Sequence, residues 1–461
     1  MNLNPQIFRE YDIRGLAERD LTDETVRAIG RGFGQRMRER GQKRVAVGRD
    51  VRLSSGRIRD ALIEGLRDQG AAVIDVGMVP TPALYFAIVT LKTDAGVMVT
   101  GSHNPIEYNG LKLSDGIQSL HGPDVLELRG RAESAGTQTA RGSVEEASVD
   151  DPYLADLVAR IGPVGPIRVV CDPGNGAASI LGPKFLKAIG CQVDAIFAEP
   201  DGRFPNHLPD PTVPALMEAL MKRVPETKAD VGIGFDGDAD RVGAVDEKGR
   251  LLFGDQVLAL YAADVLAKRP GSPIVFEVKC SQGLVEWVEQ KGGKPIMWKA
   301  GHSLIKAKMR ETHAPLGGEM SGHMFFADEF YGYDDALYGA GRLLRILASS
   351  KGTPISALVD ALPQAKYVAT PEIRLDCTDA AKFDIVNQVR EYYRARHEVL
   401  DVDGVRVQFG DGWGLVRASN TQPVLVVRFE ARSPERLQAI SRDVYEVLAR
   451  YPEVTIPALH V

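Results

Sequence analysis

Three stretches of the chain repeat one order of hydrophobic and polar positions. In each stretch a short β-branched run is followed by a turn, an amphipathic helix, a glycine and a second apolar run. In the first stretch Ile58, Leu62 and Leu66 fall on one helical face, because they lie four residues apart. A strand, a crossover helix and a second strand predict a parallel sheet. The copies begin at Arg44, Ile167 and Pro273. Their spacing of roughly 105 to 125 residues is typical of repeated domains.

Each of these units is followed by another apolar run that ends in a polar loop containing glycine. The three runs read GVMVTGSHNP, VGIGFDGDADR and APLGGEMSGH. In open α/β sheets, ligands bind at the carboxyl ends of the strands. We therefore expect the three loops to converge on one cleft.

The chain after residue 365 breaks this pattern. It alternates extended runs with helical ones, such as PEIRLDC and PERLQAISRDVYEVLARY, which favours helices on an antiparallel sheet. The sequence therefore predicts an α/β protein with three similar mixed α/β domains around a central cleft and a C-terminal α+β domain. The expected domains are residues 1–148, 149–252, 253–365 and 366–461. The polar segment 129–150, rich in Gly, Ser and Ala, is predicted to be a linker or an exposed loop.

The composition is that of a soluble globular protein. The chain has 461 residues, of which 44% are hydrophobic and 26% are charged. No run reaches the ~18 uninterrupted apolar residues of a membrane span, and the N-terminus lacks the order of a secretion signal. We therefore expect a cytoplasmic protein that does not bind membranes. The expected oligomeric state is a monomer. The net charge of -6 gives no general attraction to nucleic acid, so an anionic ligand must be bound by local clusters of Arg and Lys.

The four cysteines are far apart in the sequence and match no zinc-binding spacing. They also form no dense disulfide framework. We predict free, buried thiols at Cys171, Cys191, Cys280 and Cys377.

The second loop carries three alternating carboxylates, Asp236, Asp238 and Asp240. At that spacing on a turn, three carboxylates can face one divalent cation as hard oxygen ligands. A solvated acidic turn is the alternative. An EF-hand is excluded although Glu247 occupies its twelfth position, because Arg241 stands where that loop requires glycine and the flanks are strand-like.

The glycines of the same loop, Gly232, Gly234 and Gly237, also match the dinucleotide pattern GxGxxG. That pattern requires a helix to begin directly after it. Here the sequence DADRVGAVD follows, so we exclude a dinucleotide site.

The first loop exposes Ser102 between Gly101 and His103. Such a loop can be an ordinary turn, and it can also present a nucleophile. We exclude a hydrolytic triad, because sequence neighbours at a strand end point in opposite directions and no GxSxG elbow surrounds the serine. Among catalytic roles, a phosphoryl carrier is the best interpretation of Ser102.

Two further loops offer groups for a sugar phosphate. In the third loop, Glu319 and Ser321 are two residues apart, so on an extended strand end both side chains can point toward sugar hydroxyls. A solvated turn is the alternative. The tail sequence RASNTQP combines a guanidinium with small hydroxyl and amide donors, which suits a phosphate dianion. Its polar residues are Arg417, Ser419, Asn420 and Thr421.

Taken together, these loops resemble those of the α-D-phosphohexomutases, in the right order and over nearly the whole chain. TGSHNP resembles their phosphoserine loop, DGDADR their metal-binding loop, GEMSGH their sugar-binding loop and RASNTQP their phosphate-binding loop. The four expected domains carry these loops in turn. GEMSGH is similar to the bacterial phosphomannomutase/phosphoglucomutase group, whereas phosphoglucosamine mutases carry Gln in place of Met320. The segments REYDIRG and KAGHSLIK are similar to the same group.

The resemblance implies an enzyme that interconverts the 1-phosphates and 6-phosphates of mannose and glucose. It implies phosphoserine at Ser102 as donor and acceptor, with a hexose 1,6-bisphosphate, such as glucose 1,6-bisphosphate, as intermediate and activator. One Mg2+ ion per active site would be held by oxygens of Ser102, Asp236, Asp238 and Asp240. The alternatives are a phosphoglucosamine mutase, a metal-dependent phosphatase and a non-catalytic sugar-phosphate binding protein.

The resemblance also implies roles for single residues. A general acid/base must serve the sugar oxygen, and His302, Lys112 and Arg14 are the candidates, which the sequence does not rank. Arg241 would add positive charge near the transferred group, unless it forms a structural salt bridge, and His103 would tune the phosphoserine. The residues that would contact the substrate are Tyr11, Lys279, His302, Glu319, Ser321, His323, Arg417, Ser419, Asn420 and Thr421.

Overall fold

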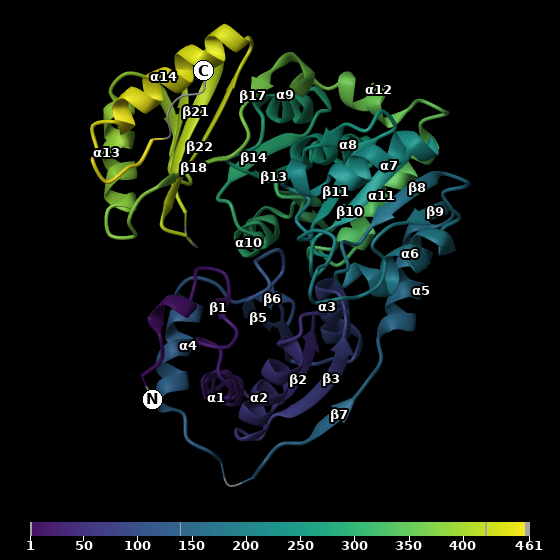
Figure 1. Cartoon of the computed structure of the whole chain (residues 1–461), viewed down its shortest axis with the longest axis vertical. Coiled ribbons are helices and arrows are strands. Elements are labelled where there is room, and N and C mark those ends of the chain that lie inside the picture. Colours follow the sequence, from purple (N-terminus) through teal and green to yellow (C-terminus); the bar gives the residue numbers. More distant parts are fainter. Residues whose placement is uncertain (1, 139, 420–421, 457–461) are drawn as a thin grey trace.

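A computed structural model describes residues 2–138, 140–419 and 422–456 of the chain. The strands of this described part form four sheets, each with its own helices. Figure 1 shows the N-terminal sheet at the bottom, the next two sheets above it and the C-terminal sheet at the upper left. No helix in the described part is both long and apolar enough to cross a membrane.

The first sheet and its helices come from the N-terminal third of the chain. Its strands are β1 (Ile13–Leu16), β2 (Arg44–Arg49), β3 (Ala72–Met78), β4 (Ala95–Val99), β5 (Tyr108–Asp115), β6 (Gln118–Ser119) and β7 (Val144–Glu146). Its helices are the short 3-10 helix η1 (Pro5–Ile7), α1 (Asp23–Glu39), α2 (Ser55–Arg67), α3 (Thr81–Thr90) and α4 (Pro123–Ser134). The strand order is β1-β5-β4-β2-β3-β7, and β6 pairs with β5.

The second sheet follows directly along the chain. Its strands are β8 (Arg168–Asp172), β9 (Gln192–Ala195), β10 (Val231–Phe235), β11 (Val242–Asp246) and β12 (Leu251–Leu252). Its helices are α5 (Asp150–Ile161), α6 (Ala178–Ala188), the short 3-10 helix η2 (Pro214–Leu216) and α7 (Glu218–Thr227). The strand order is β12-β11-β10-β8-β9.

The third sheet is the smallest of the repeated ones. Its strands are β13 (Pro273–Glu277), β14 (Lys294–Trp298), β15 (Leu316–Gly318) and β16 (Met324–Phe326), in the order β14-β13-β15-β16. Its helices are α8 (Gly254–Lys268), α9 (Gln282–Gln290), α10 (His302–Thr312), α11 (Ala336–Ser349), α12 (Ile355–Asp360) and the short 3-10 helix η3 (Pro363–Lys366).

The first three sheets share one topology, which confirms the three predicted crossovers. In each, the two strands of the repeat are parallel neighbours: β2 and β3, β8 and β9, and β13 and β14. The strand before each polar loop lies parallel on the other side, as β4, β10 or β15. An antiparallel strand then follows it, as β5, β11 or β16. The predicted apolar face of α2 is buried, since Ile58, Leu62 and Leu66 are 0% exposed. The three polar loops therefore leave equivalent strand ends.

One hydrophobic core joins the first three sheets. It includes Phe86 of α3, Phe185 of α6, Leu258 of α8 and Leu343 of α11. Helix α3 is buried along most of its length, so its sequence is apolar on all sides. A second cluster fills the other face of the first sheet, under α1, α2 and α4. Because the first core is continuous and close-packed, the three sheets hold their loops in fixed relative positions.

The fourth sheet and its helices form the C-terminal domain. Its strands are β17 (Val368–Ala369), β18 (Ile373–Asp376), β19 (Glu398–Leu400), β20 (Val405–Gln408), β21 (Gly412–Ala418) and β22 (Val424–Ala431). Its helices are α13 (Lys382–Arg394) and α14 (Pro434–Leu448). The strand pairs are antiparallel, and both helices pack on the sheet around a separate core. The predicted C-terminal α+β domain is confirmed.

The segment 129–150 is not a linker throughout, which corrects the prediction. Residues 129–134 belong to α4, where Ala132 is buried, and β7 pairs with β3. Its polar composition belongs to the exposed faces of these elements. The prediction for the four cysteines is confirmed, because all of them are free and buried.

Candidate active site

Ser102 lies in the loop that follows β4. Its backbone has a φ of +48°, in the left-handed region. Its hydroxyl donates a 2.7 Å hydrogen bond to Asp236 Oδ2 and lies 3.1 Å from His103 Nδ1. The prediction that Ser102 and His103 point in opposite directions is therefore wrong. The alternation of a strand does not apply here, because β4 ends at Val99 and the left-handed turn brings the two side chains together.

The three polar loops converge around this serine, as their strand ends predict. A Cβ atom at Gly237 in the β10–β11 loop would lie 2.3 Å from the Ser102 carbonyl oxygen, so only glycine allows the approach. From the β15–β16 loop, His323 Nε2 lies 3.2 Å from Asp240 Oδ1. The loops predicted to carry the phosphoserine, the metal and the sugar, which are named below after these predicted roles, thus lie together in one place.

Asp236, Asp238 and Asp240, here called the aspartate triad, are 0% exposed and share the site with a lysine. Lys112 Nζ, from β5, donates to Asp238 Oδ2 at 2.7 Å and also to Asp240 Oδ2. Thr81 Oγ1 donates a second hydrogen bond to Asp238 Oδ2 at 2.6 Å. Burial lowers the pKa of Lys112, but the charges of Asp238 and Asp240 outweigh it and raise that pKa well above its usual range. Lys112 is therefore held as a buried cation.

The aspartate triad can hold a divalent metal ion. One carboxylate oxygen from each residue lies within 4.8 Å of the others. Asp238 Oδ1 is buried and has no hydrogen-bond partner among the described residues. Burial, followed by the charges of Asp240 and Asp238, raises the pKa of Asp236 well above its usual range. Crowded, buried carboxylate oxygens of this kind fit a hard divalent cation.

His323 joins the sugar-binding loop to the aspartate triad. Its Nδ1 lies 2.9 Å from Glu319 Oε2, and its Nε2 lies 3.2 Å from Asp240 Oδ1. Burial lowers the pKa of His323, but Asp240 and Glu319 outweigh it and raise the pKa to about 9. The imidazole is therefore charged at neutral pH and paired with an acid on each side.

His302 is the second histidine of the site and lies beside the first. It is the first residue of α10, and its ring centroid is 5.6 Å from that of His323. Its Nδ1 lies 3.6 Å from Asp334 Oδ2. Burial, followed by the charge of Lys306, lowers the pKa of His302 well below its usual range. The two neighbouring imidazoles therefore differ in charge.

Glu319 and Ser321 do not lie on an extended strand end, which corrects the predicted geometry. Strand β15 ends at Gly318, and residues 319–322 form a turn in which Gly322 N donates to Glu319 O at 3.0 Å. Both side chains nevertheless meet at His323 Nδ1, with Ser321 Oγ at 3.2 Å. Glu319 Oε1 also accepts a 2.6 Å hydrogen bond from the backbone N–H of Gly301.

Two predicted arginines contact the loops that carry Ser102 and Asp236. Arg14 of β1 donates to Gly101 O at 2.6 Å. Its other terminal nitrogen donates to Asp12 Oδ2, just before β1. The Arg241 backbone N–H donates to Asp236 Oδ1 at 3.1 Å, and Arg241 Nε lies 3.3 Å from His323 Nε2. Positive charge is thus placed against both the serine loop and the triad.

The Ala300 peptide links the first, third and fourth sheets. Tyr11 OH, from the N-terminal segment, donates to Ala300 O at 2.7 Å. Ala300 N donates to Asp403 Oδ2 at 3.0 Å, and Arg417 Nε of β21 donates to the same oxygen at 3.0 Å. The predicted phosphate-binding arginine therefore lies beside the predicted sugar-binding residues.

Lys279 lies just beyond β13 and is connected to the sugar-binding loop. Its Nζ is 2.9 Å from Glu372 Oε2 and 3.3 Å from Glu277 Oε2. Glu277 Oε1 in turn accepts a 2.9 Å hydrogen bond from Met320 N. The buried Glu277 carboxylate therefore joins Lys279 to the backbone of the sugar-binding loop.

The phosphate-binding loop of the C-terminal domain is described at both of its ends. Ser419 Oγ accepts a 3.1 Å hydrogen bond from Gln422 N. Lys382 of α13, which is buried, donates to Ser419 O and to Gln422 O, the latter at 3.0 Å. Asn420 and Thr421, also predicted to bind phosphate, lie outside the described residues.

Two charged residues that hold the site together are not among the predicted ones. Arg52 follows β2 and donates to Ser102 O at 2.9 Å. Lys306 Nζ donates to Asp334 Oδ1 at 2.8 Å. The sequence position of each could have indicated its place in the site. Arg52 stands at the carboxyl end of a repeat strand, and Lys306 lies four residues after His302 on one helical face.

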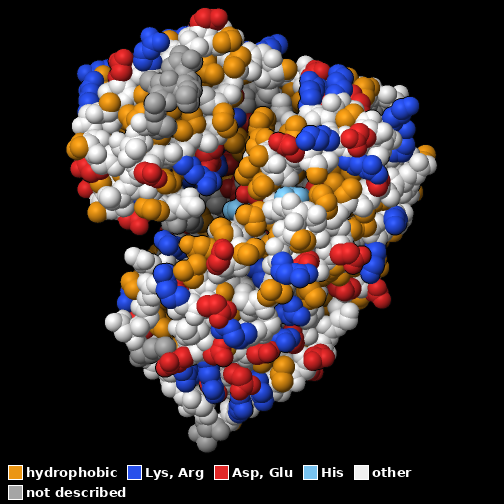
Figure 2. Space-filling model, in the orientation of Figure 1, with side chains coloured by type: hydrophobic (Ala, Val, Ile, Leu, Met, Phe, Trp, Pro, Cys, Tyr) orange, Lys and Arg blue, Asp and Glu red, His pale blue; other side chains and the backbone are white. Residues whose placement is uncertain are grey.

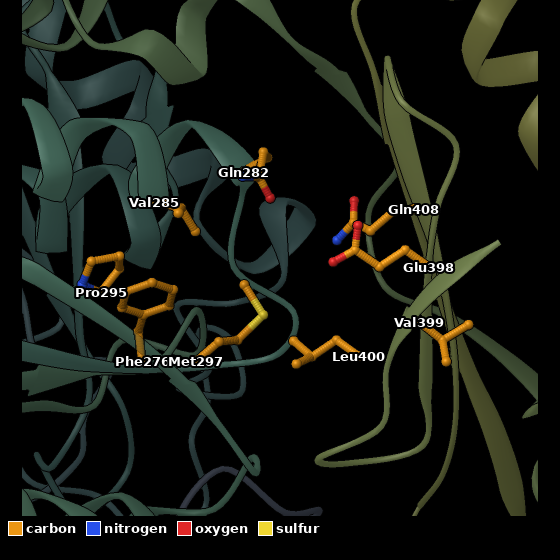
Figure 3. A pocket seen from close by; sticks show the side chains of 9 residues that line it. All are labelled: Phe276, Gln282, Val285, Pro295, Met297, Glu398, Val399, Leu400 and Gln408. Atoms are coloured by element: carbon orange, nitrogen blue, oxygen red, sulfur yellow. The ribbon is translucent and has the colours of Figure 1, made fainter. Parts of the chain in front are cut away.

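The molecular surface is hollowed at the site and also at a second place. Figure 2 shows a hollow between the C-terminal domain and the rest of the molecule, with histidine side chains beside it. A separate groove of about 230 Å³ lies between the third and fourth sheets. Figure 3 shows its lining, with Met297 of β14 opposite Leu400 of β19. This lining comes from α9, β13, β14, β19 and β20, so the groove is distinct from the convergent loops.

Four family models match the chain one after another. They are described as phosphoglucomutase/phosphomannomutase alpha/beta/alpha domains I, II and III and the phosphoglucomutase/phosphomannomutase C-terminal domain. They match residues 5–123, 151–249, 253–365 and 372–447, respectively. Together they cover most of the chain.

Relatives and a solved structure match over nearly the full length. A phosphomannomutase/phosphoglucomutase of Pseudomonas putida is 45% identical over 458 residues, which cover 99% of this chain and 98% of the relative. A phosphoglucomutase of Neisseria gonorrhoeae is 39% identical over 461 residues, with 99% of each chain covered. The crystal structure of a phosphoglucomutase/phosphomannomutase family protein from Burkholderia thailandensis matches with a TM-score of 0.92 at 42% identity, covering 99% of this chain and 100% of that chain.

Proposed function

Because the chain belongs to the phosphoglucomutase/phosphomannomutase family, it is a hexose-phosphate mutase, and we propose that Ser102 carries the phosphoryl group it transfers. The observation that carries this proposal is the position of Ser102 Oγ, 2.7 Å from Asp236 Oδ2, where the three loops converge. The proposed substrates are the 1-phosphates and 6-phosphates of mannose and glucose.

In the proposed cycle, phosphoserine at Ser102 donates its phosphoryl group to the free hydroxyl of a hexose monophosphate. The bond from Oγ to phosphorus breaks and a bond from phosphorus to the sugar oxygen forms. The sugar hydroxyl loses a proton, and Ser102 Oγ gains one. The hexose 1,6-bisphosphate then turns, and Ser102 Oγ loses its proton and bonds the other phosphorus. The bond from that phosphorus to the sugar oxygen breaks, and the released sugar oxygen takes up a proton. No phosphate is gained or lost, so the product is the isomeric monophosphate.

We propose that the aspartate triad, with an oxygen at Ser102, holds one Mg2+ ion. Bound there, Mg2+ supplies positive charge that neutralises the transferring phosphoryl oxygens. The buried carboxylate oxygens support this assignment, as does Asp238 Oδ1, for which the described part of the chain offers no hydrogen-bond partner. Lys112 holds two of the triad carboxylates in place from the side of the first sheet.

We propose His302 and His323 as the groups that move the sugar proton. They are buried side by side near the triad, and each lies near an acid. For His302 that acid is Asp334, and for His323 it is Glu319. Two adjacent imidazoles, one neutral and one charged, suit a reaction that must both take and return a proton.

The remaining predicted catalytic residues fit electrostatic and orienting roles. Lys112 and Arg14 both donate to fixed acceptors, so we assign them to charge stabilisation rather than proton transfer. Arg241 lies against Asp236 and His323, where its charge faces the transferring group. His103 Nδ1 lies 3.1 Å from Ser102 Oγ, so we assign His103 to tuning the reactivity of this serine.

The substrate contacts divide between the sugar and the phosphate that does not react. Glu319 and Ser321 are proposed to bind sugar hydroxyls that lie equivalently in both orientations of the bisphosphate. Arg417, joined to the sugar-binding side through Asp403, is proposed to hold the distal phosphate. Since all of these groups come from one chain, we propose that a monomer contains a complete site.

A coupled assay of the 1-phosphates of mannose, glucose, glucosamine and N-acetylglucosamine tests this function. We expect turnover of the mannose and glucose phosphates in the presence of Mg2+ and loss of turnover in excess chelator. Preference for glucosamine 1-phosphate would contradict the proposed sugar class. Release of inorganic phosphate instead of the 6-phosphate would contradict a mutase, and full activity in chelator would exclude the metal.

A further inference from the structure

We infer that Arg52 is the positioning residue that holds the phosphoserine loop, residues 101–108, in the conformation that phosphoryl transfer requires. The inference rests on the proposed role of Ser102. Arg52 follows β2, and its side chain is almost fully buried, so it offers no surface to a bound sugar phosphate.

The guanidinium of Arg52 donates hydrogen bonds to backbone carbonyl groups along the whole loop. Arg52 Nη1 donates to Pro105 O at 2.7 Å and to Tyr108 O at 2.9 Å. Arg52 Nη2 donates to Ser102 O at 2.9 Å and to Asn104 O. Because a guanidinium is flat and its donors have a fixed geometry, it sets the relative positions of four carbonyl groups at once.

The charge of Arg52 is buried and balanced at the same place. Its side chain is only 1% exposed, and Asp50 Oδ2 lies 3.5 Å from its Nε. Asp50 Oδ2 also accepts a 3.0 Å hydrogen bond from Gly101 N. Asp50 and Arg52 therefore both bind the loop beside Ser102, Asp50 through the Gly101 N–H and Arg52 through backbone carbonyls.

The neighbouring residues fit around this guanidinium. A Cβ atom at Gly101 would lie 2.2 Å from Arg52 Nε, so only glycine lets the arginine pass under the loop. Phe204, from a loop of the second sheet, places its ring 5.3 Å from Arg52 Cζ. The carbonyl group of Ser102, at the left-handed turn, is thus approached by both Arg52 and Gly237.

Loss of Arg52 would leave the loop carbonyls without their buried donor. Unpaired buried carbonyls are costly, so the loop should move to find new partners. Phosphoryl transfer depends on the alignment of the attacking and leaving oxygens, and a shift of about 1 Å can reduce a rate about a hundredfold. The substrate contacts lie on other loops and should remain intact.

Arg52→Gln is the variant that tests the inference. We expect kcat with glucose 1-phosphate to fall about a hundredfold while KM stays within about threefold of wild type. Phosphorylation of Ser102 by glucose 1,6-bisphosphate, followed by intact mass, should slow by a similar factor. Arg52→Lys should recover little of the rate, because an ammonium group cannot reproduce the fork of four hydrogen bonds.

Arg57→Gln is the matched control. Arg57 lies on α2 of the same domain and also donates to backbone carbonyls, those of Leu21 at 3.0 Å and Ala17 at 2.8 Å. Its loss should reduce stability without changing kcat by more than about twofold, since neither carbonyl belongs to the phosphoserine loop. A purely structural role for Arg52 would make the two variants behave alike.

A second variant keeps the test valid if Arg52→Gln does not fold. Gly101→Ala pushes the loop away from Arg52 Nε and should lower kcat in the same way. Gly56→Ala is its control, because a Cβ at Gly56 meets nothing within 4 Å.

A folded Arg52→Gln enzyme with wild-type kcat, an equal loss in Arg57→Gln, or full recovery by Arg52→Lys would each overturn the inference. Mapping of phosphate in the wild type separates this result from a failure of the proposed function. Phosphate on a residue other than Ser102 would defeat both, whereas phosphate on Ser102 with unaffected Arg52 variants would defeat only the positioning role.

Discussion

Buried charges of opposite sign hold individual side chains of the active site in position. Lys306 Nζ, for example, lies 2.8 Å from Asp334 Oδ1 and 2.9 Å from Ser119 Oγ, and its side chain is 2% exposed. Removing one member of such a pair leaves an uncompensated buried charge, which costs roughly 3 to 5 kcal/mol. Every rate measured on a variant of these residues therefore needs a stability measurement beside it.

Arg417 is predicted to grip the phosphate that does not react. Arg417→Ala removes a charge-assisted contact worth about 1.5 to 3 kcal/mol, so KM for glucose 1-phosphate should rise roughly ten- to a hundredfold. Because the bisphosphate must be gripped again after it turns, the variant should also release glucose 1,6-bisphosphate and gain activity when it is added. Steady-state kinetics with and without added bisphosphate measure both effects.

Arg436→Ala serves as the control for Arg417→Ala. Arg436 lies in the same domain and pairs with Asp411 at 2.7 Å, away from the phosphate-binding loop. KM should be unchanged in this variant. If Arg417→Ala also keeps its KM and gains nothing from added bisphosphate, Arg417 does not bind phosphate.

A histidine outside the catalytic loops makes part of the stability depend on pH. His207 Nε2 lies 3.1 Å from Asp172 Oδ2. Burial lowers the pKa of His207, but the hydrogen bond and the charge of Asp172 outweigh it and raise the pKa above 6.5. The folded state therefore binds this proton more tightly than the unfolded state. The contribution is fully present below pH 6.5 and is lost as the pH rises through the folded pKa.

His207→Gln should accordingly lower the free energy of unfolding more at pH 6 than at pH 9. Urea unfolding at the two pH values measures this difference. A loss of equal size at both values would show that the charged form of His207 contributes nothing.

At the scale of the elements, helices α1 and α2 cross so closely that the crossing point requires glycine. A Cβ atom at Gly65 would lie 2.2 Å from Arg27 O and 2.9 Å from Gly30 Cα. Gly65→Ala should force the helices apart and lower the free energy of unfolding by about 1 to 3 kcal/mol. Gly56→Ala, on the same helix in open space, should be neutral or stabilising by up to about 1 kcal/mol. Equal melting temperatures for the two variants would contradict the close packing.

The repeated elements could be predicted because their signals are local. The β-branched runs and the spacing of Ile58 and Leu62 lie within single segments, and they became the parallel crossovers. The direction of Ser102 could not be predicted, since its left-handed turn is imposed by Arg52 and Gly237 from other parts of the chain. Likewise, no spacing in the sequence indicates that Lys112 of β5 pairs with the aspartate triad.

At the scale of the whole molecule, a buried arginine docks the C-terminal domain on the third sheet. Arg406 Nη1 donates to Val278 O and Cys280 O, both at 2.7 Å. Its Cζ lies 3.8 Å from the centroid of the Trp413 ring, and burial lowers the pKa of Arg406 to about 10. Trp413 lies on β21, the strand that carries Arg417, so this contact sets the position of the phosphate-binding arginine.

Arg406→Gln should loosen this docking. The loss of charge-assisted hydrogen bonds should let the C-terminal domain move away from the third sheet in a fraction of the molecules. We expect kcat/KM to fall about tenfold or more. Small-angle X-ray scattering should show a larger radius of gyration than for wild type or for Arg436→Gln. Wild-type scattering and wild-type kinetics would contradict a docking role for Arg406.

Whether Ser102 carries the phosphoryl group can be measured directly by intact mass and peptide mapping. Wild-type protein incubated with glucose 1,6-bisphosphate should gain one phosphate, and mapping should place it on Ser102. Ser102→Ala should gain none and should lose activity by at least about a thousandfold. Phosphate on another residue of the wild type, or an active Ser102→Ala enzyme, would contradict the assignment of Ser102 as the phosphoryl carrier.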